Sequence, residues 1–247
     1  MIFIKRTAPP KELTDEVVKK LTNLYKEKNS SVWAKRYIKD ALLNMSHNKC
    51  CYCEAPLDQQ GLYMQVEHFH PKSRYPDEVV SWDNLLPVCP TCNSRKRELD
   101  TIKVPFIDPS EQNPQNLFTI NNYRYVPKKN NEKARKTIEV LGLNSVDKLV
   151  LNRFAVGNAL LERIEKLYKS VSVNQDDYNS LVPNATELVG VLESVQRNNA
   201  YSATISSLLI NSEYYKKVKD IFKKNNVWDD DLKKLDSEAR KIAFDQL

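Results

Sequence analysis

Apolar residues recur at helical spacing in the first part of the chain. Residues 14–28 carry an apolar stripe and predict a helix whose N-cap is Thr14 or Asp15. Residues 31–45 carry a second stripe and predict a second helix. The first stripe consists of Val17, Leu21, Leu24 and Tyr25, and the second of Trp33, Tyr37, Ala41 and Leu42.

The pattern becomes shorter and richer in turns between residues 48 and 110. Within this region "LYMQVEHF" predicts a strand, and "CNSRKREL" predicts the start of a short helix. Residues 111–130 place Asn and Pro around two short β-like runs. This arrangement predicts a connecting segment with a hairpin turn at Asn121 and Asn122.

Helical periodicity returns after residue 131 and continues to the end of the chain. The stretch "NEKARKTIEVLGLN" predicts a helix stopped by Gly142, and residues 146–168 predict a long amphipathic helix. The Lys-rich run "YYKKVKDIFKK" is expected to be a solvated helix face. Further helices are predicted near residues 185–197, 201–224 and 229–246.

Together these patterns predict an α+β protein that is mostly α. The expected order is N-terminal helices over residues 1–46, a small core over 47–110, a connecting segment over 111–130 and a C-terminal helical lobe over 131–247. A chain of 247 residues is long enough to bury a core as one large domain or as two small ones.

Net charge and hydropathy bear on the partners of the protein and on its location in the cell. The formal net charge of +6 is compatible with a polyanionic partner, although charge alone does not establish one. No apolar run approaches the roughly 20 residues that span a bilayer. The opening "MIFIKRTAPP" has too short an apolar core for a signal peptide. We therefore expect a cytoplasmic protein without a membrane segment.

The five cysteines lie in two clusters and predict a metal site. Cys50-x-x-Cys53 and Cys89-x-x-Cys92 form two knuckles of the kind that presents four thiolates to one tetrahedral zinc ion. Such a site is closed and structural. Buried reduced thiols or a redox pair are the alternatives, and two matched pairs make them less favoured. Cys51 has poorer spacing and is expected to pack or to be exposed.

The two knuckles are separated by residues 54–88, which is longer than the roughly 15–20 residues of a simple two-knuckle finger. The inserted text includes "VEHFHPKS", which holds two of the three histidines of the chain, and "WDNLLPVCPTCNSRK" follows it. The order of these residues resembles the HNH nuclease motif. A CxxC pair is followed by an acid and a histidine, then by an asparagine, and then by a second CxxC pair with a polar residue directly after it. The resemblance implies a zinc-braced ββα-metal fold for the predicted core.

The chemistry of phosphodiester hydrolysis explains these residue types. It needs a base near neutral pKa, which a histidine supplies, and a hard cation held by oxygen ligands. By resemblance His68 is the general base, and Glu67 is a ligand of catalytic Mg²⁺ or Mn²⁺. Asn84 matches the middle asparagine, which orients the base or reaches the metal. Asn93 stands where the family's final histidine is found and would offer an amide oxygen.

One feature of the strand limits this prediction. Neighbouring residues of a strand point to opposite faces, so Glu67 and His68 can serve one site only if the strand ends or twists there. Pro71 favours an ending.

Four further polar residues are candidates for contacts with nucleic-acid phosphates. They are His70, Lys72, Arg95 and Lys96. Each is equally well explained as an ordinary surface residue.

A closer resemblance covers residues 2 to about 155. It is carried by "IFIKRTAPP", "CCYCE", "VEHFHPKS", "WDNLLPVCPTCNSRK", "FIDPSEQNP" and "ARKTIEVLGLN". These segments are similar to the PtuB family, the HNH nuclease subunits of Septu-type and retron-associated anti-phage systems. Members commonly carry arginine where this chain has His70. The resemblance implies an effector nuclease that cuts nucleic acid, DNA first and tRNA as the alternative, under the control of an ABC-type ATPase partner.

Two other functions remain open at this point. One is a stand-alone restriction-type HNH endonuclease, in which the helical lobe reads DNA. The other is a zinc-knuckle module that binds nucleic acid without cutting it. For the lobe itself, which shows no catalytic constellation, we expect a part in docking the ATPase.

Overall fold

The structure divides into two compact units, and each unit is formed by two separate stretches of the chain. The structure is a computed structural model, and it describes residues 1–57, 63–173, 175 and 177–246. Unit 1 comprises Met1–Pro114 and Lys129–Leu143, and unit 2 comprises Gln115–Lys128 and Asn144–Leu247. As predicted, the protein is mostly helical with small sheets, an α+β fold. No helix among the described residues is both long and apolar enough to cross a membrane.

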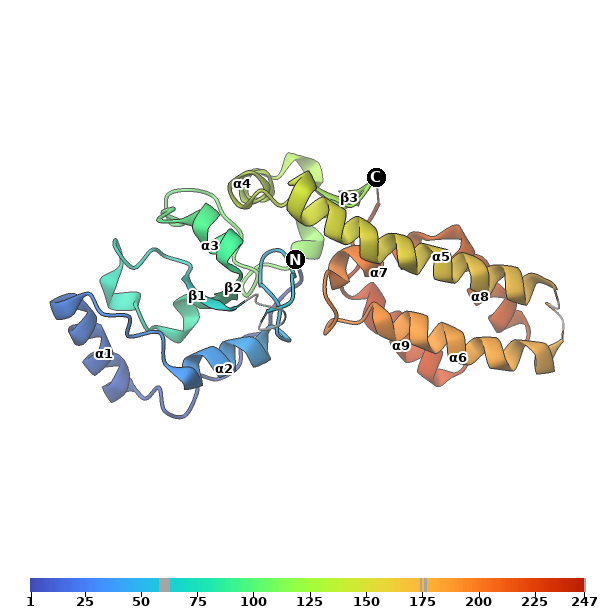
Figure 1. Cartoon of the computed structure of the whole chain (residues 1–247), viewed down its shortest axis with the longest axis horizontal. Helices are drawn as coiled ribbons and strands as arrows, with labels where there is room; N and C mark the ends of the chain where they lie inside the picture. Colours follow the sequence, from blue (N-terminus) through green and yellow to red (C-terminus); the bar gives the residue numbers. More distant parts are fainter. Residues whose placement is uncertain (58–62, 174, 176, 247) are drawn as a thin grey trace. The chain divides into compact units, whose positions relative to one another are not determined.

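Unit 1 is built around one short hairpin and the helix that follows it (Figure 1). Its strands pair antiparallel, with Glu67 opposite Leu86 and His68 opposite Leu85. β2 is buried along its whole length. The elements of unit 1 are α1 (Asp15–Lys28), α2 (Arg36–Met45), β1 (Gln65–His68), η1 (Pro76–Glu78), η2 (Trp82–Asn84), β2 (Leu85–Val88), α3 (Pro90–Lys96) and α4 (Glu132–Leu141).

The N-terminal helices follow the sequence pattern with one correction. Thr14 caps α1 by accepting a hydrogen bond from the amide of Val17, as expected of a threonine at an N-cap. The second helix was predicted from residue 31, but α2 begins at Arg36, because tight turns precede it and Lys35 has extended backbone. Trp33 therefore lies outside the helix. The residues that α2 buries are Ile38, Leu42 and Met45.

α4 groups with unit 1, although residues 131–143 were expected to open the C-terminal lobe. It ends as predicted at Gly142, which adopts left-handed backbone at φ 56°. The guanidinium of Arg95 donates to the carbonyls of Leu141 and Gly142 at 2.8 and 2.9 Å. Thr137 accepts a hydrogen bond from the amide of Ile107. These two polar contacts attach α4 to the segment that carries α3.

Unit 2 begins with the predicted hairpin. Asn122 and Tyr123 both have positive φ, which suits the two-residue turn between strands of right-handed twist. The long helix α5 contacts α6, α7 and α8, and α6 contacts α9. In Figure 1 the yellow α5 and the orange α6 run side by side. The elements of unit 2 are β3 (Phe118–Asn121), β4 (Arg124–Pro127), the π-helical η5 (Val146–Val150), α5 (Leu151–Val173), α6 (Tyr178–Ser194), α7 (Ser202–Asn211), α8 (Glu213–Lys224) and α9 (Asp230–Arg240).

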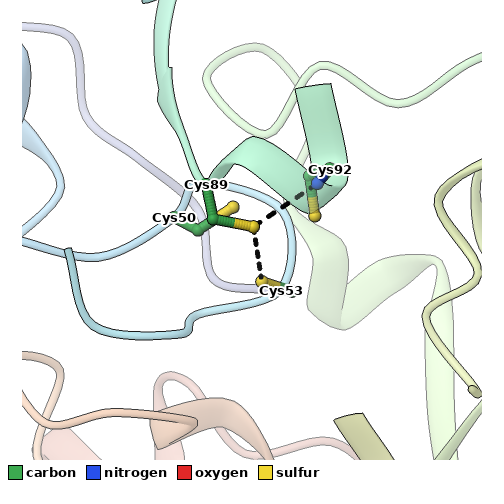
Figure 2. Close-up of side chains that lie close together, drawn as sticks. All are labelled: Cys50, Cys53, Cys89 and Cys92. Carbon is green, nitrogen blue, oxygen red and sulfur yellow. Dashed lines mark hydrogen bonds between the residues drawn. The ribbon is translucent and has the colours of Figure 1, made fainter. Parts of the chain in front are cut away.

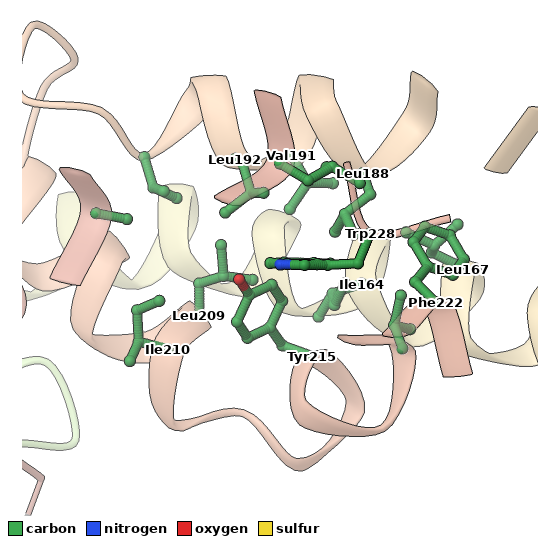
Figure 3. Packing of buried hydrophobic residues seen from close by; sticks show 14 of the residues in the cluster. Ile164, Leu167, Leu188, Val191, Leu192, Leu209, Ile210, Tyr215, Phe222 and Trp228 are labelled. Carbon is green, nitrogen blue, oxygen red and sulfur yellow. The ribbon is translucent and has the colours of Figure 1, made fainter. Parts of the chain in front are cut away.

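The helices of unit 2 enclose a continuous apolar core (Figure 3). Residues 201–224 were predicted as one helix, but the chain breaks at Ser212, whose extended backbone ends α7 and whose hydroxyl caps α8. The break lets α7 run through the interior, where its residues from Ser202 to Ile210 are all buried. The 3-10 turns η3 (Pro114–Asn116) and η4 (Lys128–Asn130) lie in sequence where the chain passes between the units.

Candidate functional site

Four cysteines of unit 1 meet at one point (Figure 2). The sulfur atoms of Cys50, Cys53, Cys89 and Cys92 all lie within 4.8 Å of one another, and all four side chains are buried. Cys89 also caps α3, because its sulfur accepts a hydrogen bond from the amide of Cys92. Four converging thiols are the donor set that zinc takes in closed structural sites, so these residues fit a metal ion.

Cys51 stays outside this cluster. Its side chain is buried, and its backbone amide donates to the carbonyl of Pro87 on β2 at 2.9 Å. Burial raises the pKa of the Cys51 thiol well above its usual range, so the thiol is neutral. Of the two expected roles, packing or exposure, the structure shows packing.

Several of the predicted site residues line one cleft of about 880 Å³ in unit 1. Its lining comes from the turn before α2, from α2, from β1 and the residues on both sides of it, and from α3 and the residues directly after it. The residues discussed below that line it are Trp33, Lys39, Gln65, Glu67, His68, Lys72, Asn93 and Arg97. β1 ends at His68, which meets the condition under which neighbouring Glu67 and His68 can reach the same space.

His68 is held in one orientation by two contacts. Its Nε2 lies 2.9 Å from the carbonyl oxygen of Val79, and its ring meets Trp33 edge to face with centroids 4.9 Å apart. Because a carbonyl can only accept, Nε2 of the neutral ring carries the proton and Nδ1 keeps the lone pair. Burial lowers the pKa of His68 to about 4, so the ring is neutral at pH 7.

Glu67 is buried beside a buried lysine. Lys96 forms an ion pair with Oε1 of Glu67, and its ammonium also donates to the backbone carbonyl of His68 at 2.9 Å. Burial raises the pKa of Glu67 to about 7, and the charge of Lys96 opposes that rise. The ammonium of Lys96 therefore contacts both Glu67 and His68 at the end of β1.

Asn93 follows the last cysteine and faces β1. Its Nδ2 donates to Oε1 of Gln65 at 2.7 Å. Within the described part of the chain no group donates to Oδ1 of Asn93. The cleft thus brings together a carboxylate, an amide oxygen and an imidazole nitrogen, a donor set suited to a hard divalent cation with a base beside it.

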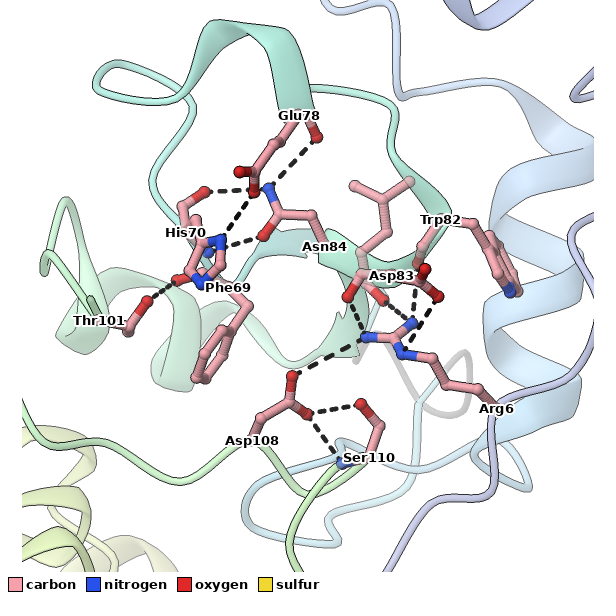
Figure 4. Close-up of polar contacts among 11 residues, drawn as sticks. Arg6, Phe69, His70, Glu78, Trp82, Asp83, Asn84, Thr101, Asp108 and Ser110 are labelled. Carbon is pink, nitrogen blue, oxygen red and sulfur yellow. Dashed lines mark hydrogen bonds and ion pairs between the residues drawn. The ribbon is translucent and has the colours of Figure 1, made fainter. Parts of the chain in front are cut away.

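Asn84 holds the backbone of His70 and Glu78 (Figure 4). Its Oδ1 accepts from the amide of His70 at 2.7 Å, and its Nδ2 donates to the carbonyls of His70 and Glu78 at 3.1 and 3.2 Å. The carbonyl that holds His68 belongs to Val79, directly after Glu78. Asn84 therefore fixes the loop that orients His68. The side chain of Asn84 does not line the cleft but lines a second pocket.

His70 also faces that second pocket of about 560 Å³. Its Nδ1 lies 2.7 Å from a carboxylate oxygen of Glu78, and its ring contacts those of Phe69 and Tyr75. The predicted phosphate contact would require His70 to line the cleft with His68. The structure places the two histidines in different pockets.

The remaining predicted cations have different surroundings. Lys72 lines the cleft, 5.1 Å above the Trp33 ring and 3.8 Å from Glu98. Arg95 is turned to the end of α4, and Lys96 is only 2% exposed. As the structure stands, neither Arg95 nor Lys96 offers its charge to a phosphate in the cleft.

Sequence reasoning missed three residues that shape this region. Arg97 is exposed, lines the cleft and stands four residues after Asn93, a helical spacing that could have signalled a shared face. Trp33 was assigned to a buried stripe, yet it forms the cleft wall against His68. Arg6 donates to the carbonyls of Trp82 and Leu85 on either side of Asn84, and no local pattern signals that contact (Figure 4).

Comparison with known proteins agrees with this geometry. The HNH endonuclease family matches residues 50–98, the segment that contains the four cysteines, both strands and α3. Over 248 aligned residues the chain is 40% identical to the Septu protein PtuB of Bacillus thuringiensis. The alignment covers 98% of this chain and 94% of that protein. The chain therefore belongs to the PtuB family and is an HNH endonuclease.

Proposed function

We propose that the protein is the metal-dependent nuclease effector of a Septu-type anti-phage defence system. The observation that carries the proposal is that Glu67, His68 and Asn93 all line one cleft, with His68 held through Nε2 by the carbonyl of Val79. That arrangement leaves Nδ1 as the basic nitrogen at the end of β1.

In this proposal His68 Nδ1 takes the proton of the attacking water. Glu67 and Asn93 are proposed to hold Mg²⁺ or Mn²⁺, because both line the cleft and both carry side-chain oxygen atoms. When bound, this cation stabilises negative charge on the phosphate and on the leaving oxygen. Asn84 is a positioning residue that fixes the loop bearing the Val79 carbonyl.

The four-cysteine cluster holds structural Zn²⁺ in the same proposal. Its cysteines come from the knuckle before β1 and from the junction of β2 and α3. A zinc ion there joins the two ends of the inserted segment and holds α3 against the hairpin. The roles of the two metals are thus separate, one for the fold and one for the chemistry.

Phosphate contacts are proposed for the cations that line the cleft. They are Lys39, Lys72 and Arg97. These contacts position a nucleic-acid backbone without reading its sequence. The substrate proposed first is DNA, and tRNA is the alternative.

The defence setting comes from the relative, whose name places it in a Septu system. We extend that setting to this chain and propose a cytoplasmic complex with an ABC-type ATPase that controls cutting. Unit 2 is proposed to supply part of the docking surface. If a chain ending near residue 155 still co-purified with the ATPase, the docking role of unit 2 would be wrong.

The proposal is tested with labelled plasmid DNA and total tRNA, with and without Mg²⁺. Wild type and His68→Ala are each co-expressed with any ABC-type ATPase that is encoded beside the gene, and each is also expressed alone. Mg²⁺-dependent cutting by wild type, lost in His68→Ala, supports the proposal and names the substrate.

The other outcomes separate the rival functions. Cutting that needs no ATPase would favour a stand-alone restriction-type endonuclease. Binding that falls steeply with salt, without cutting by either protein, would favour a zinc-knuckle binding module and contradict the family assignment of an active nuclease.

A further inference from the structure

Trp33 has surroundings unlike those of the other two tryptophans of the chain. Trp82 is 7% exposed and donates through its indole N–H to the carbonyl of Thr7 at 2.8 Å. Trp228 is 8% exposed and belongs to the apolar core of unit 2. Trp33 is only half-buried and lines the cleft, and no described residue accepts a hydrogen bond from its indole N–H. A buried tryptophan usually finds a partner for that group, so Trp33 leaves aromatic surface and one donor open to the cleft.

The indole ring lies beside the groups that are proposed to act on a phosphate. Its centroid is 4.9 Å from that of His68, the proposed base. The ammonium of Lys72, a proposed phosphate contact, lies over the ring at 5.1 Å. A nucleotide whose phosphate lies near His68 and Lys72 therefore brings a base within reach of the indole.

A nucleotide can replace the contact between Lys72 and the ring. The side chain of Lys72 is 30% exposed, and the carboxylate of Glu98 lies 3.8 Å from its ammonium. An exposed cation–π contact is weaker than the stacking of a base on an aromatic side chain. A phosphate is also a stronger partner for an ammonium than an aromatic ring is. Binding is therefore favoured when the base takes the ring and Lys72 takes the phosphate.

A base that stacks in this position has to be unpaired. Inside a duplex the neighbouring bases cover both faces of each base, so an aromatic side chain reaches a base face only in single strands, in loops or after the base has been flipped out. Every base has such a face, and stacking therefore selects the structure of the substrate and not its sequence.

We propose that Trp33 stacks on an unpaired base beside the scissile phosphate, and that the nuclease therefore prefers single-stranded or looped nucleic acid to a duplex. The inference rests on the proposed function, because it takes His68 and Lys72 as groups that face the phosphate. It deepens that function by naming the structural class of the substrate, which applies to DNA and to RNA alike.

The first experiment compares kcat/KM for the single strand and the duplex of one sequence, made both as DNA and as RNA. The protein is full-length, zinc-loaded wild type, alone or with the ATPase, in whichever form it cuts. The single strand should be cut at least about tenfold better than its duplex, in DNA, in RNA or in both. Equal cutting, or better cutting of the duplex, would overturn the proposal.

The second experiment tests the contact between residue 33 and the base. A series of single strands is made in which each strand lacks one base near the cleavage site, and each is cut by wild type and by Trp33→Leu. One missing base should lower kcat/KM of wild type by about tenfold and leave that of Trp33→Leu unchanged, because this variant has already lost the stacking. A purely structural role of Trp33 would slow the cutting of all strands equally. If each missing base cost both proteins the same factor, the proposal would be wrong.

Two further variants separate stacking from damage to the site. Trp33→Phe keeps a smaller ring and should retain a reduced dependence on the same base, and it replaces Trp33→Leu if that variant does not fold. Phe69→Leu is the matched control, because Phe69 follows His68 directly but lines the second pocket. It should depend on the missing base as wild type does. Zinc content and far-UV circular dichroism check folding, and loss of the dependence in Phe69→Leu would contradict the assignment to Trp33.

Failure of this inference can be told apart from failure of the proposed function. Cutting that depends on His68 but shows no coupling between residue 33 and a base overturns the inference alone. Wild-type protein that cuts neither single strands nor duplexes, with or without the ATPase, overturns both.

Discussion

The two units of this protein differ in what accompanies their apolar burial. Unit 1 has four-residue strands and a seven-residue α3, and besides its buried apolar side chains it has four converging thiols and polar contacts to backbone carbonyls. Unit 2 is held by a large apolar cluster that five helices enclose. Its most elaborate polar feature is Asp236, which accepts from Tyr215, Lys219 and Arg240.

The difference shows how a short segment can carry chemistry. The residues of the hairpin and α3 that line one cleft include a carboxylic acid, an amide and an imidazole, so this segment has to satisfy polar groups beside its buried apolar side chains. Charge pairing does so for Glu67 and Lys96, and metal ligation is proposed for the four cysteines. Unit 2 presents no comparable cluster within its described residues, and its stability rests on packing.

Loss of the metal proposed at the cysteine cluster should break this comparison most severely. Cys89→Ser is expected to unfold the hairpin and α3 while unit 2 keeps its helices, because structural zinc sites supply roughly 10–16 kcal/mol of apparent binding free energy. The measurements are zinc content and limited proteolysis of the full-length protein. Cys51→Ser is the matched control, and it should retain zinc. Full zinc occupancy in Cys89→Ser would contradict the cluster assignment.

A core truncation in unit 2 should have the next largest effect. Phe222 is fully buried in the apolar cluster, so Phe222→Ala should lower the free energy of unfolding by about 3–5 kcal/mol. Urea denaturation followed by circular dichroism measures the loss. Phe154→Ala, at a side chain 47% exposed, should cost far less. Zinc content should stay the same in both variants, and a fall in Phe222→Ala would show that the units depend on each other.

The buried carboxylate of unit 2 gives a smaller, pH-dependent effect. Burial opposes the ionisation of Asp236, but hydrogen bonds from Arg240, Lys219 and Tyr215 outweigh it and lower the pKa of this carboxyl. Asp236→Asn should cost about 1–3 kcal/mol at pH 7. Since the folded pKa lies below the unfolded value of about 3.9, the wild-type advantage should be full above that value and disappear as pH falls through the folded pKa.

Urea midpoints of wild type and Asp236→Asn across the acid range check this sign. Asp230→Asn is the control, because Asp230 is 98% exposed and, among the described residues, pairs with Lys233 alone. A difference between wild type and Asp236→Asn that grew as the pH fell would contradict the assignment.

The smallest predicted effect separates Arg95 of α3 from Arg97, the residue that follows the last residue of α3. Arg97→Met should weaken nucleic-acid binding uniformly across sequences and reduce the salt slope of log K by about 1, without changing stability. Arg95→Met should do the reverse, because Arg95 donates to the carbonyls at the end of α4. Filter binding at several salt concentrations, with urea denaturation alongside, measures both. Equal loss of binding in the two variants would place Arg95 in the cleft as well.

The sequence predicted what depends on local pattern and on ligand spacing. The two CxxC pairs meet as expected, Gly142 ends α4, and Asn122 lies in the turn of the second hairpin. The helix end and the turn follow from preferences that act over a few residues, and the meeting of the two pairs follows from the four ligands that one tetrahedral zinc ion takes. The helix boundaries near Trp33 and Ser212 were wrong, because tertiary packing overrode a continuous apolar pattern.

The direction in which an individual side chain points could not be predicted from local sequence pattern. Arg95 follows Asn93 by two residues on α3, which turns it about 200° around the helix axis and away from the cleft. His70 follows His68 by two residues, but β1 has already ended and the chain has turned into another pocket. Gln65 becomes visible as a partner of Asn93 only when strand and helix are placed together.

The most direct test of the cleft as the active site compares its two neighbouring histidines. Single-turnover cleavage of the preferred substrate is measured for wild type, His68→Ala and His70→Ala at equal zinc content. Removal of a general base should slow cutting by about 10²–10⁴-fold in His68→Ala, while His70→Ala should stay close to wild type. If His70→Ala lost activity and His68→Ala kept it, the base would lie in the second pocket, and the assignment of the cleft would be wrong.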